Sequence, residues 1–306
     1  MTIAGQSIPR CCLVLFAALL GGLLPASVAV ADVDLATKFS NQTTIGNTRH
    51  NLTQRQTAGG GPAGVLMDPY RNDFQQVCVY CHTPHGANTD VALPLWNRTI
   101  KATTYTTYGS PSLTNTTVTQ PGANSLACLS CHDGQTAVDS VINMPGSGGY
   151  LDSQKTSQSN AFLNTWNNSR GPDATVHVGL AGAECLACHA AGAGIVGAGA
   201  TDFTVFAIGT NLNNDHPVGV LLPVGDDWNV PAGIKGTTKF FDSDGDGIMD
   251  KNEVRFYSGD RGPEVECASC HDPHGVPSGG PGSPFNKSFL RVTDTGSAIC
   301  LACHNK

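Results

Sequence analysis

The chain has 306 residues, of which 40% are hydrophobic and 13% charged, and its formal net charge at pH 7 is −7. This acidic balance argues against nucleic acids and anionic membrane surfaces as partners. With 36 glycines, 18 prolines and only 7% aromatic residues, the chain would bury a poor core of its own, so something other than side chains should fill its interior.

Residues 1–31 are predicted to be a secretory signal peptide that is cleaved. Arg10 is their only charge, the run from Cys11 to Val30 is apolar, and Ala29-Val30-Ala31 is a small-x-small cleavage site. The alternative is an uncleaved membrane anchor, because the apolar run is nearly long enough to span a bilayer. Cleavage leaves one secreted domain, residues 32–306, with no segment inserted in a membrane.

Five Cys-x-x-Cys-His units account for ten of the 12 cysteines, all except Cys11 and Cys12. In a secreted chain this unit is typical of c-type haem attachment, in which both cysteines form thioether bonds and the histidine binds the iron. Zinc sites and a disulfide scaffold are the alternatives, but neither explains a histidine after every second cysteine. The sequence therefore predicts five covalently bound haems c, held by Cys78/Cys81/His82, Cys128/Cys131/His132, Cys185/Cys188/His189, Cys267/Cys270/His271 and Cys300/Cys303/His304.

The histidine count supports this interpretation, because the chain has ten histidines and the five units use half of them. The others are predicted to be the distal ligands of the five irons. The alternative is that some are surface residues, while some irons bind methionine or keep an open position. Ligation by two histidines should keep the haem potentials lower than His/Met ligation would. The predicted distal ligands are His50, His85, His177, His216 and His274.

His85 and His274 stand three residues after the histidine of their own units, in the doubled motifs Cys78–His85 and Cys267–His274. Three residues span at most about 10 Å, which is too short to carry the chain around a porphyrin to the far face of the same iron. Each is therefore predicted to bind the iron of a neighbouring haem. His50 precedes the first unit by a flexible segment, so it could fold back onto its own subunit or reach into another.

Residues 242–253 match the pattern of an EF-hand-like calcium loop, with oxygen-bearing residues at the ligand positions and glycine at the sixth. The alternative is a solvated acidic turn. A single loop is not an EF-hand pair, so a bound calcium ion would be a structural clip upstream of Cys267. The predicted ligands are the side chains of Asp242, Asp244, Asp246, Asp250 and Glu253 and the carbonyl of Ile248.

Long runs with helical or strand periodicity are hard to find in this chain. The predicted fold class is a mostly irregular chain with short helices and few short strands, organised around five covalently attached c-type haems.

Several segments together resemble the doubled-CxxCH multihaem cytochromes, and within that group the tetrahaem OmcE-type outer-surface cytochromes, which polymerise into extracellular filaments. The resemblance implies a coil wrapped around a stack of bis-histidine haems. It also implies that a histidine near the N-terminus completes a haem of the adjoining subunit, and His50 is the matching position here. The segments that carry it are Thr48-Arg49-His50-Asn51-Leu52, Cys78–His85, Asn214-Asp215-His216-Pro217, Glu266–His274 and Ala298–Lys306.

The chain departs from a tetrahaem relative in its third unit. Without residues at about 145–205, four units and four distal histidines remain. These residues are therefore predicted to be an inserted segment that carries a fifth haem, with His177 on the distal face of the haem held by His189.

These patterns predict electron transfer, and no catalysis, by a protein that is secreted to the cell exterior or surface. The resemblance implies a homopolymer that exchanges electrons with partner cytochromes and extracellular acceptors. The alternatives are a soluble periplasmic pentahaem electron shuttle and a multihaem nitrite or hydroxylamine reductase. The reductase would need an iron with an open site, which the histidine count does not leave.

Overall fold

A computed structural model describes residues 40–53, 74, 76–109, 118–143, 179–180, 185–190 and 202–305. All of them belong to the second of the two units into which the chain divides, Asp32–Lys306. The predicted signal peptide, His177 and most of the predicted insertion lie outside the described residues, and so does the side chain of Cys188. Within the described part of the chain, no helix has the length and apolar character needed to cross a membrane.

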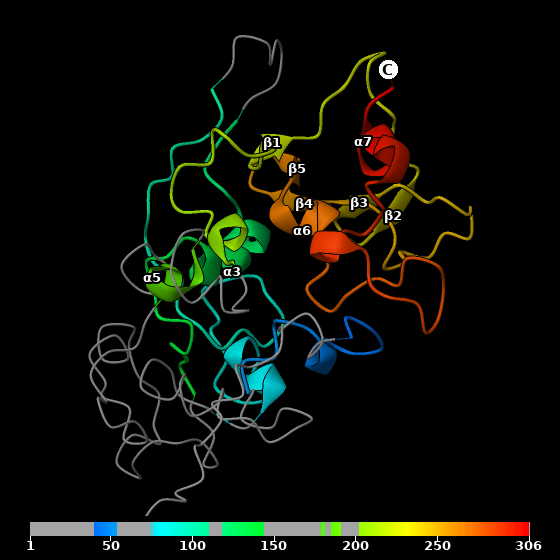
Figure 1. Ribbon diagram of the computed structural model, residues 1–306. Helices are drawn as coiled ribbons and strands as arrows, with labels where there is room; N and C mark the ends of the chain where they lie inside the picture. Colours follow the sequence, from blue (N-terminus) through cyan, green and yellow to red (C-terminus); the bar gives the residue numbers. More distant parts are fainter. Residues whose placement is uncertain are drawn as a thin grey trace, which may run out of the picture. The chain divides into compact units, whose positions relative to one another are not determined.

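Short helices interrupt the described part of the chain, which is mostly coil (Figure 1). Each α-helix includes both cysteines of one Cys-x-x-Cys-His unit. The predicted fold class is confirmed to this extent: coil dominates, with few short helices and one small sheet. The α-helices are α3 (Ala123–His132), α5 (Cys185–His189), α6 (Cys267–Cys270) and α7 (Ala298–Cys303). The 3-10 helices are η1 (Ile45–Asn47), η2 (Val77–Tyr80), η5 (Thr204–Phe206), η6 (Lys287–Phe289) and η7 (Thr295–Ser297).

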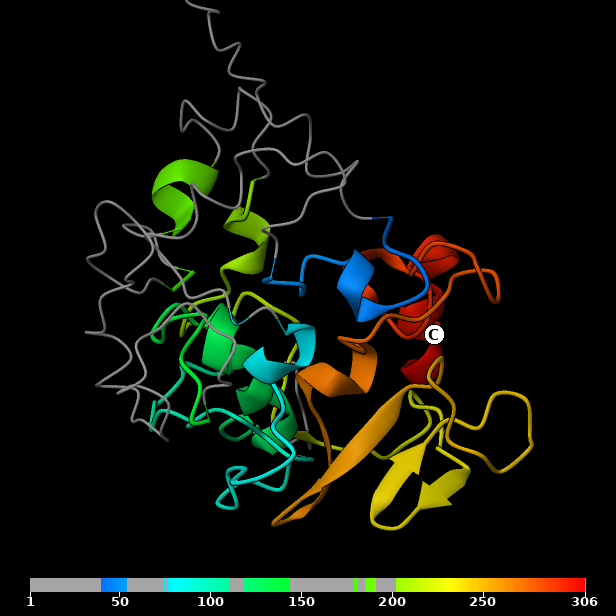
Figure 2. The same cartoon turned by 90° about the horizontal axis from the view of Figure 1, so that it is seen from below.

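The sheet lies between the third and fourth units along the chain, and its antiparallel strands follow the order β1-β5-β4-β3-β2. Two hairpins build most of it, and they are visible in yellow and orange in Figure 2. Gly236 opens the connection between β2 and β3 with a φ of +60°, which glycine adopts without strain. The strands are β1 (Val220–Leu221), β2 (Gly233–Lys235), β3 (Thr238–Phe240), β4 (Arg255–Gly259) and β5 (Gly262–Val265).

The buried apolar side chains of the described residues form three small clusters instead of one core. Each cluster includes a residue inside or close to a Cys-x-x-Cys-His unit: Val79 and Tyr80, Leu129, and Val265. Apolar burial is thus distributed around the units. The clusters comprise Phe74, Val79, Tyr80 and Val141; Tyr105, Leu129 and Leu212; and Val220, Phe256 and Val265.

Arg98 is fully buried and links the first unit to the second. Its guanidinium donates to the Ser130 carbonyl (2.7 Å) and hydroxyl (3.1 Å), and to the carbonyls of Val138 (2.9 Å) and Ala137 (3.0 Å). Burying a guanidinium is costly unless its donors are bonded, and these bonds meet that requirement. The hydrogen bonds of Arg98 therefore connect the segment after the first unit with the second unit, which belong to separate apolar clusters.

Candidate haem attachment and ligation sites

Four Cys-x-x-Cys-His units place both cysteines in one short helix, in α3, α5, α6 or α7, whereas in the first unit η2 includes Cys78 and ends just before Cys81. Residues three apart on a helix lie on the same face, so the two cysteines of a unit can reach one flat group together. None of the cysteines whose side chains the structure describes forms a disulfide, and these are Cys78, Cys81, Cys128, Cys131, Cys185, Cys267, Cys270, Cys300 and Cys303.

Cys188 is the one predicted attachment cysteine to which this observation does not extend. Its backbone belongs to α5, three residues after Cys185, but its side chain lies outside the part of the chain that the structure describes. The third unit therefore has the helical turn that the motif requires, whereas haem attachment through Cys188 stays a prediction from the sequence.

The histidines of three units share one hydrogen-bonding arrangement, in which the ring Nδ1 meets a backbone carbonyl. A carbonyl can only accept, so Nδ1 carries the proton and Nε2 keeps its lone pair for a metal. Burial also lowers the pKa of His132 and His271, which favours the neutral ring that a metal ligand needs. The contacts are His82 to Pro94 (2.8 Å), His132 to Phe206 (2.7 Å) and His271 to Ser288 (2.7 Å).

Aromatic rings support the histidines of the other two units. The ring of His189 stacks on Phe203 with the centroids 4.1 Å apart and the planes 3° from parallel. The ring of His304 lies 4.3 Å from that of Trp228. These contacts restrict how the imidazoles can turn.

His50, a predicted distal ligand, lies against the second unit of its own chain. The centroids of the His50 and His132 rings are 6.3 Å apart, and the ring planes are 87° from parallel. Its Nδ1 donates to the Pro273 carbonyl (3.2 Å), and its ring stacks on Phe289 at 4.5 Å. Burial, followed by the charge of His132, lowers the pKa of His50 to about 4, so the ring is neutral at pH 7.

His274, the last residue of the second doubled motif, faces the histidine of the first unit. The His274 and His82 ring centroids are 6.2 Å apart, and the planes are 14° from parallel. The Nδ1 of His274 donates to the Asp272 carboxylate (3.1 Å), so its Nε2 is the nitrogen left for a metal. Two units far apart in sequence therefore meet at these two rings.

The remaining predicted distal ligands differ in their surroundings. The Nδ1 of His216 donates to the Pro217 carbonyl (3.1 Å), and burial, then the charge of His304, lower the pKa of His216. His216 thus lies close to the fifth unit. Within the described part of the chain, no hydrogen bond or ring contact is formed by the exposed imidazole of His85.

Each doubled motif pairs with a return segment in the same backbone register, which sequence reasoning did not find. In the first motif, the Thr83 N–H donates to the Leu95 carbonyl (2.9 Å) and the Asn97 N–H to the Cys81 carbonyl (2.9 Å). The equivalent bonds of the second motif run from Asp272 to Phe289 (2.8 Å) and from Arg291 to Cys270 (2.7 Å).

The two motifs also share the hydrogen bond of their first histidine and a left-handed backbone conformation beside it. In both motifs, the carbonyl that accepts from the first histidine belongs to the residue before a left-handed one. The left-handed residues are Leu95 (φ +51°) and Phe289 (φ +59°), and neither is glycine. In the second motif Ser288 is left-handed as well (φ +52°). Such angles are costly and cluster at functional sites, so we interpret these turns as devices that aim the carbonyl at the histidine.

The second and fourth units lie side by side, because α3 packs on α6. The thiols of Cys128 and Cys267 are neighbours, and this proximity raises the pKa of Cys128 and lowers the pKa of Cys267. Glu266 accepts from the Gly122 N–H (3.0 Å) and from the Ser125 hydroxyl, so its carboxylate bridges the two helices. Burial outweighs these bonds and raises the pKa of Glu266 to about 7.

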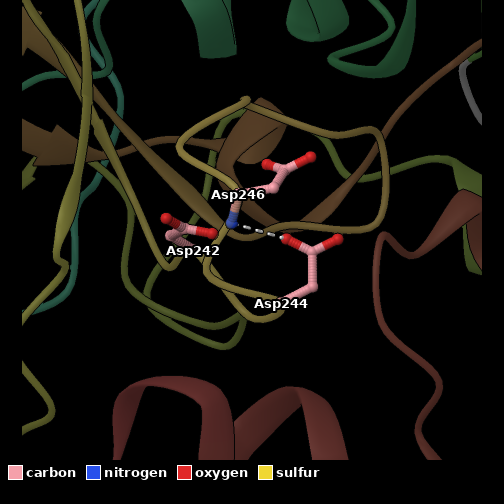
Figure 3. A group of neighbouring side chains, drawn as sticks. All are labelled: Asp242, Asp244 and Asp246. Atoms are coloured by element: carbon pink, nitrogen blue, oxygen red, sulfur yellow. Dashed lines mark hydrogen bonds between the residues drawn. The ribbon is translucent and has the colours of Figure 1, made fainter.

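The predicted calcium loop brings three carboxylates together, as Figure 3 shows. Oxygens of Asp242, Asp244 and Asp246 all lie within 4.8 Å of one another. The buried Glu253 carboxylate accepts from the N–H groups of Ser243 (2.7 Å) and Asp250 (2.9 Å), so it lies across the loop. Burial and the neighbouring carboxylates raise the pKa of Asp250.

Comparison with known families supports the class of protein that these sites define. Residues 262–306, which contain the fourth and fifth units, match the doubled CXXCH motif family. The match supports a multihaem c-type cytochrome, a haem-binding electron-transfer class. No curated protein matches the chain.

The residues present fit covalently bound haem c. In four units the paired cysteines lie on a single short helix, and in three of the five units the histidine has its Nδ1 bonded to a carbonyl. This donor set suits an iron porphyrin held by two thioethers and imidazole Nε2.

Proposed function

We propose that the protein transfers electrons through five bis-histidine haems c and polymerises into a conductive extracellular filament. The observation that carries the electron-transfer part is the set of imidazoles whose Nδ1 is bonded, so that Nε2 is available to iron: His82, His132, His271, His50, His216 and His274. Haem c supplies one-electron redox chemistry when it is bound.

The chain's own residues would attach the haems, orient the ligand imidazoles and tune the haem potentials. The cysteines hold each group at a helical turn, and the bonded Nδ1 atoms fix the imidazole planes. A hydrogen bond from Nδ1 to an oxygen also makes the imidazole a more basic ligand, which favours the oxidised metal. The ten histidines would supply two ligands to each of five irons and leave no position open for substrate, so we assign electron transfer and no catalysis.

The haem content tests the first part of this proposal. Full-length protein matured in a host that attaches haem c should carry five haems by mass and by haem absorbance. All five should be low-spin in the resting oxidised state. A resting high-spin haem would favour a reductase instead.

Support for the filament comes from the resemblance to OmcE-type cytochromes. Electron microscopy of secreted material should show filaments made of this one chain, and purified filaments should pass electrons to partner cytochromes and extracellular acceptors. A monodisperse monomer with five low-spin haems, found in the periplasm, would instead establish the soluble shuttle.

We propose in addition that residues 242–253 bind one calcium ion as a structural clip. Support comes from the loop pattern and from the gathered carboxylates of Asp242, Asp244 and Asp246. Chelation should lower the melting temperature of the holoprotein, and added calcium should restore it. Asp244→Asn should weaken this response, whereas purified protein free of calcium by elemental analysis would refute the proposal.

A further inference from the structure

We infer that His50 is the second axial ligand of the iron held by the second unit, opposite His132 and within the same chain. This rests on the proposed haem binding, and it differs from the role that the resemblance implies, in which His50 completes a haem of an adjoining subunit. The argument has three parts: the ring separation, the direction of the nitrogens and the attachment of the segment around His50.

The separation of the two rings suits an iron between them. A metal–imidazole bond is about 2 Å long and a ring nitrogen lies about 1 Å from the ring centre, so two axial imidazoles have centres about 6 Å apart. The His50 and His132 centroids are 6.3 Å apart, and the His82 and His274 centroids 6.2 Å. Two independent histidine pairs thus show the same spacing.

Ring separation alone is weak evidence, because ordinary aromatic pairs also lie about 4.5–7 Å apart. The hydrogen bonds of the ring nitrogens favour the ligand interpretation. Nδ1 of His132 donates to Phe206 (2.7 Å) and Nδ1 of His50 donates to Pro273 (3.2 Å). Each ring is therefore held by the nitrogen that does not bind metal and presents Nε2, as paired ligands must.

The segment that carries His50 is attached to its own chain before the histidine, at its ring, and after it, where Leu52 packs against the cluster of Phe74, Val79, Tyr80 and Val141. Before it, the Asn41 carbonyl accepts from the Phe285 N–H (2.6 Å), and Thr48 is fully buried. The His50 ring itself stacks on Phe289 (4.5 Å). Reaching into another subunit would break these contacts.

The two ring pairs differ in a property that spectroscopy can detect. The His50 and His132 planes are 87° apart, whereas the His82 and His274 planes are 14° apart. In ferric low-spin haems, near-perpendicular axial planes leave the iron d orbitals almost degenerate and produce a strongly anisotropic electron paramagnetic resonance signal. Near-parallel planes split these orbitals and produce a rhombic signal.

The test uses full-length holoprotein with His50→Ala. The haem content should stay unchanged, one haem should become high-spin, and the strongly anisotropic signal should decrease by one haem. Added imidazole should restore the low-spin state. His50→Met should retain a six-coordinate iron with a thioether charge-transfer band and a raised potential, which also covers a poorly matured alanine variant.

Asn47→Ala is the matched control, because Asn47 is exposed on the same segment and should leave every haem low-spin. Dilution of the wild-type protein to monomer should also leave all haems low-spin. The inference is overturned if His50→Ala stays fully low-spin, or if a high-spin haem appears in the wild type on dilution. Absence of covalent haem from the wild type would instead refute the proposed function.

Discussion

The doubled motifs Cys78–His85 and Cys267–His274 share a backbone frame but treat their last histidine differently. In the second motif the Asp272 carboxylate accepts from the N–H (3.0 Å) and from Nδ1 (3.1 Å) of His274, which faces His82. In the first motif the Thr83 hydroxyl donates to the His85 carbonyl (3.0 Å), so it does not restrain the ring. The residue directly after the unit therefore makes the difference: Asp272 orients the His274 ring, whereas Thr83 holds His85 only through its backbone carbonyl.

The frame itself is held by different side chains at equivalent positions. Asn97 donates to the Val79 carbonyl (2.7 Å), and Arg291 donates to the equivalent Ala268 carbonyl (3.0 Å). Arg291 also bonds the Lys251 carbonyl (2.9 Å), which connects the second motif to the predicted calcium loop. The same backbone register therefore accommodates either Asn97, whose short amide bonds locally, or Arg291, whose longer side chain reaches other segments.

Removing the Arg291 side chain should have the largest effect on stability among the variants that compare the two motifs. Arg291→Ala removes the arginine partner of the buried Asp272 carboxylate and one donor from each of two carbonyls, so it should destabilise the holoprotein by about 3–5 kcal/mol. Asn97→Ala at the equivalent position should cost only about 1–3 kcal/mol. Denaturant unfolding followed by haem absorbance measures both, and equal losses would contradict the wider role of Arg291.

The buried Glu266 precedes the second motif, whereas Val77 stands at the equivalent position of the first. Because the folded-state pKa is raised to about 7 from an ordinary 4.5, ionisation opposes folding: the penalty is absent below pH about 4 and complete above pH about 7. Stability should therefore fall by up to about 3 kcal/mol across this range. Thermal unfolding at a series of pH values should show the slope in wild type and a flatter profile in Glu266→Gln.

Phe289 and Leu95 occupy the same left-handed position, but only Phe289 stacks on a histidine, whereas the side chain of Leu95 is 54% exposed. Phe289→Leu should loosen His50 and cost about 1 kcal/mol. The strongly anisotropic signal should broaden as the His50 plane becomes less fixed. Leu95→Ala, the control, should leave all spectra unchanged, and an unaltered signal in Phe289→Leu would contradict the positioning role.

Thr83→Asp should have the smallest effect on stability, about 1 kcal/mol, because one hydrogen bond is replaced. Asp272→Thr also removes the partner of Arg291, so this variant is compared by haem potential and not by stability. Asp272→Thr makes His274 a less basic ligand, so the potential of one haem should rise. Thr83→Asp is the reciprocal variant and should orient His85. Potentiometric titration of both variants measures the effect, and no shift in Asp272→Thr would show that the carboxylate does not tune His274.

Much of the candidate site could be predicted from short patterns. The five units, the spare histidines and the loop at 242–253 were recognisable because thioether attachment and metal ligation require particular residue types at close spacing. The fold class was predictable for a related reason: few apolar runs and many glycines leave little with which to build long elements.

What the sequence alone determined, then, is the inventory: the candidate attachment cysteines, the candidate ligands and a chain poor in regular structure. Tertiary structure decided the pairing, because the His50–Pro273 bond and the His82–His274 approach join residues some 200 positions apart. It also decided the orientation of the rings, because their acceptors are mostly backbone carbonyls. Every residue carries a carbonyl, so no residue pattern marks the one that a fold turns toward a histidine.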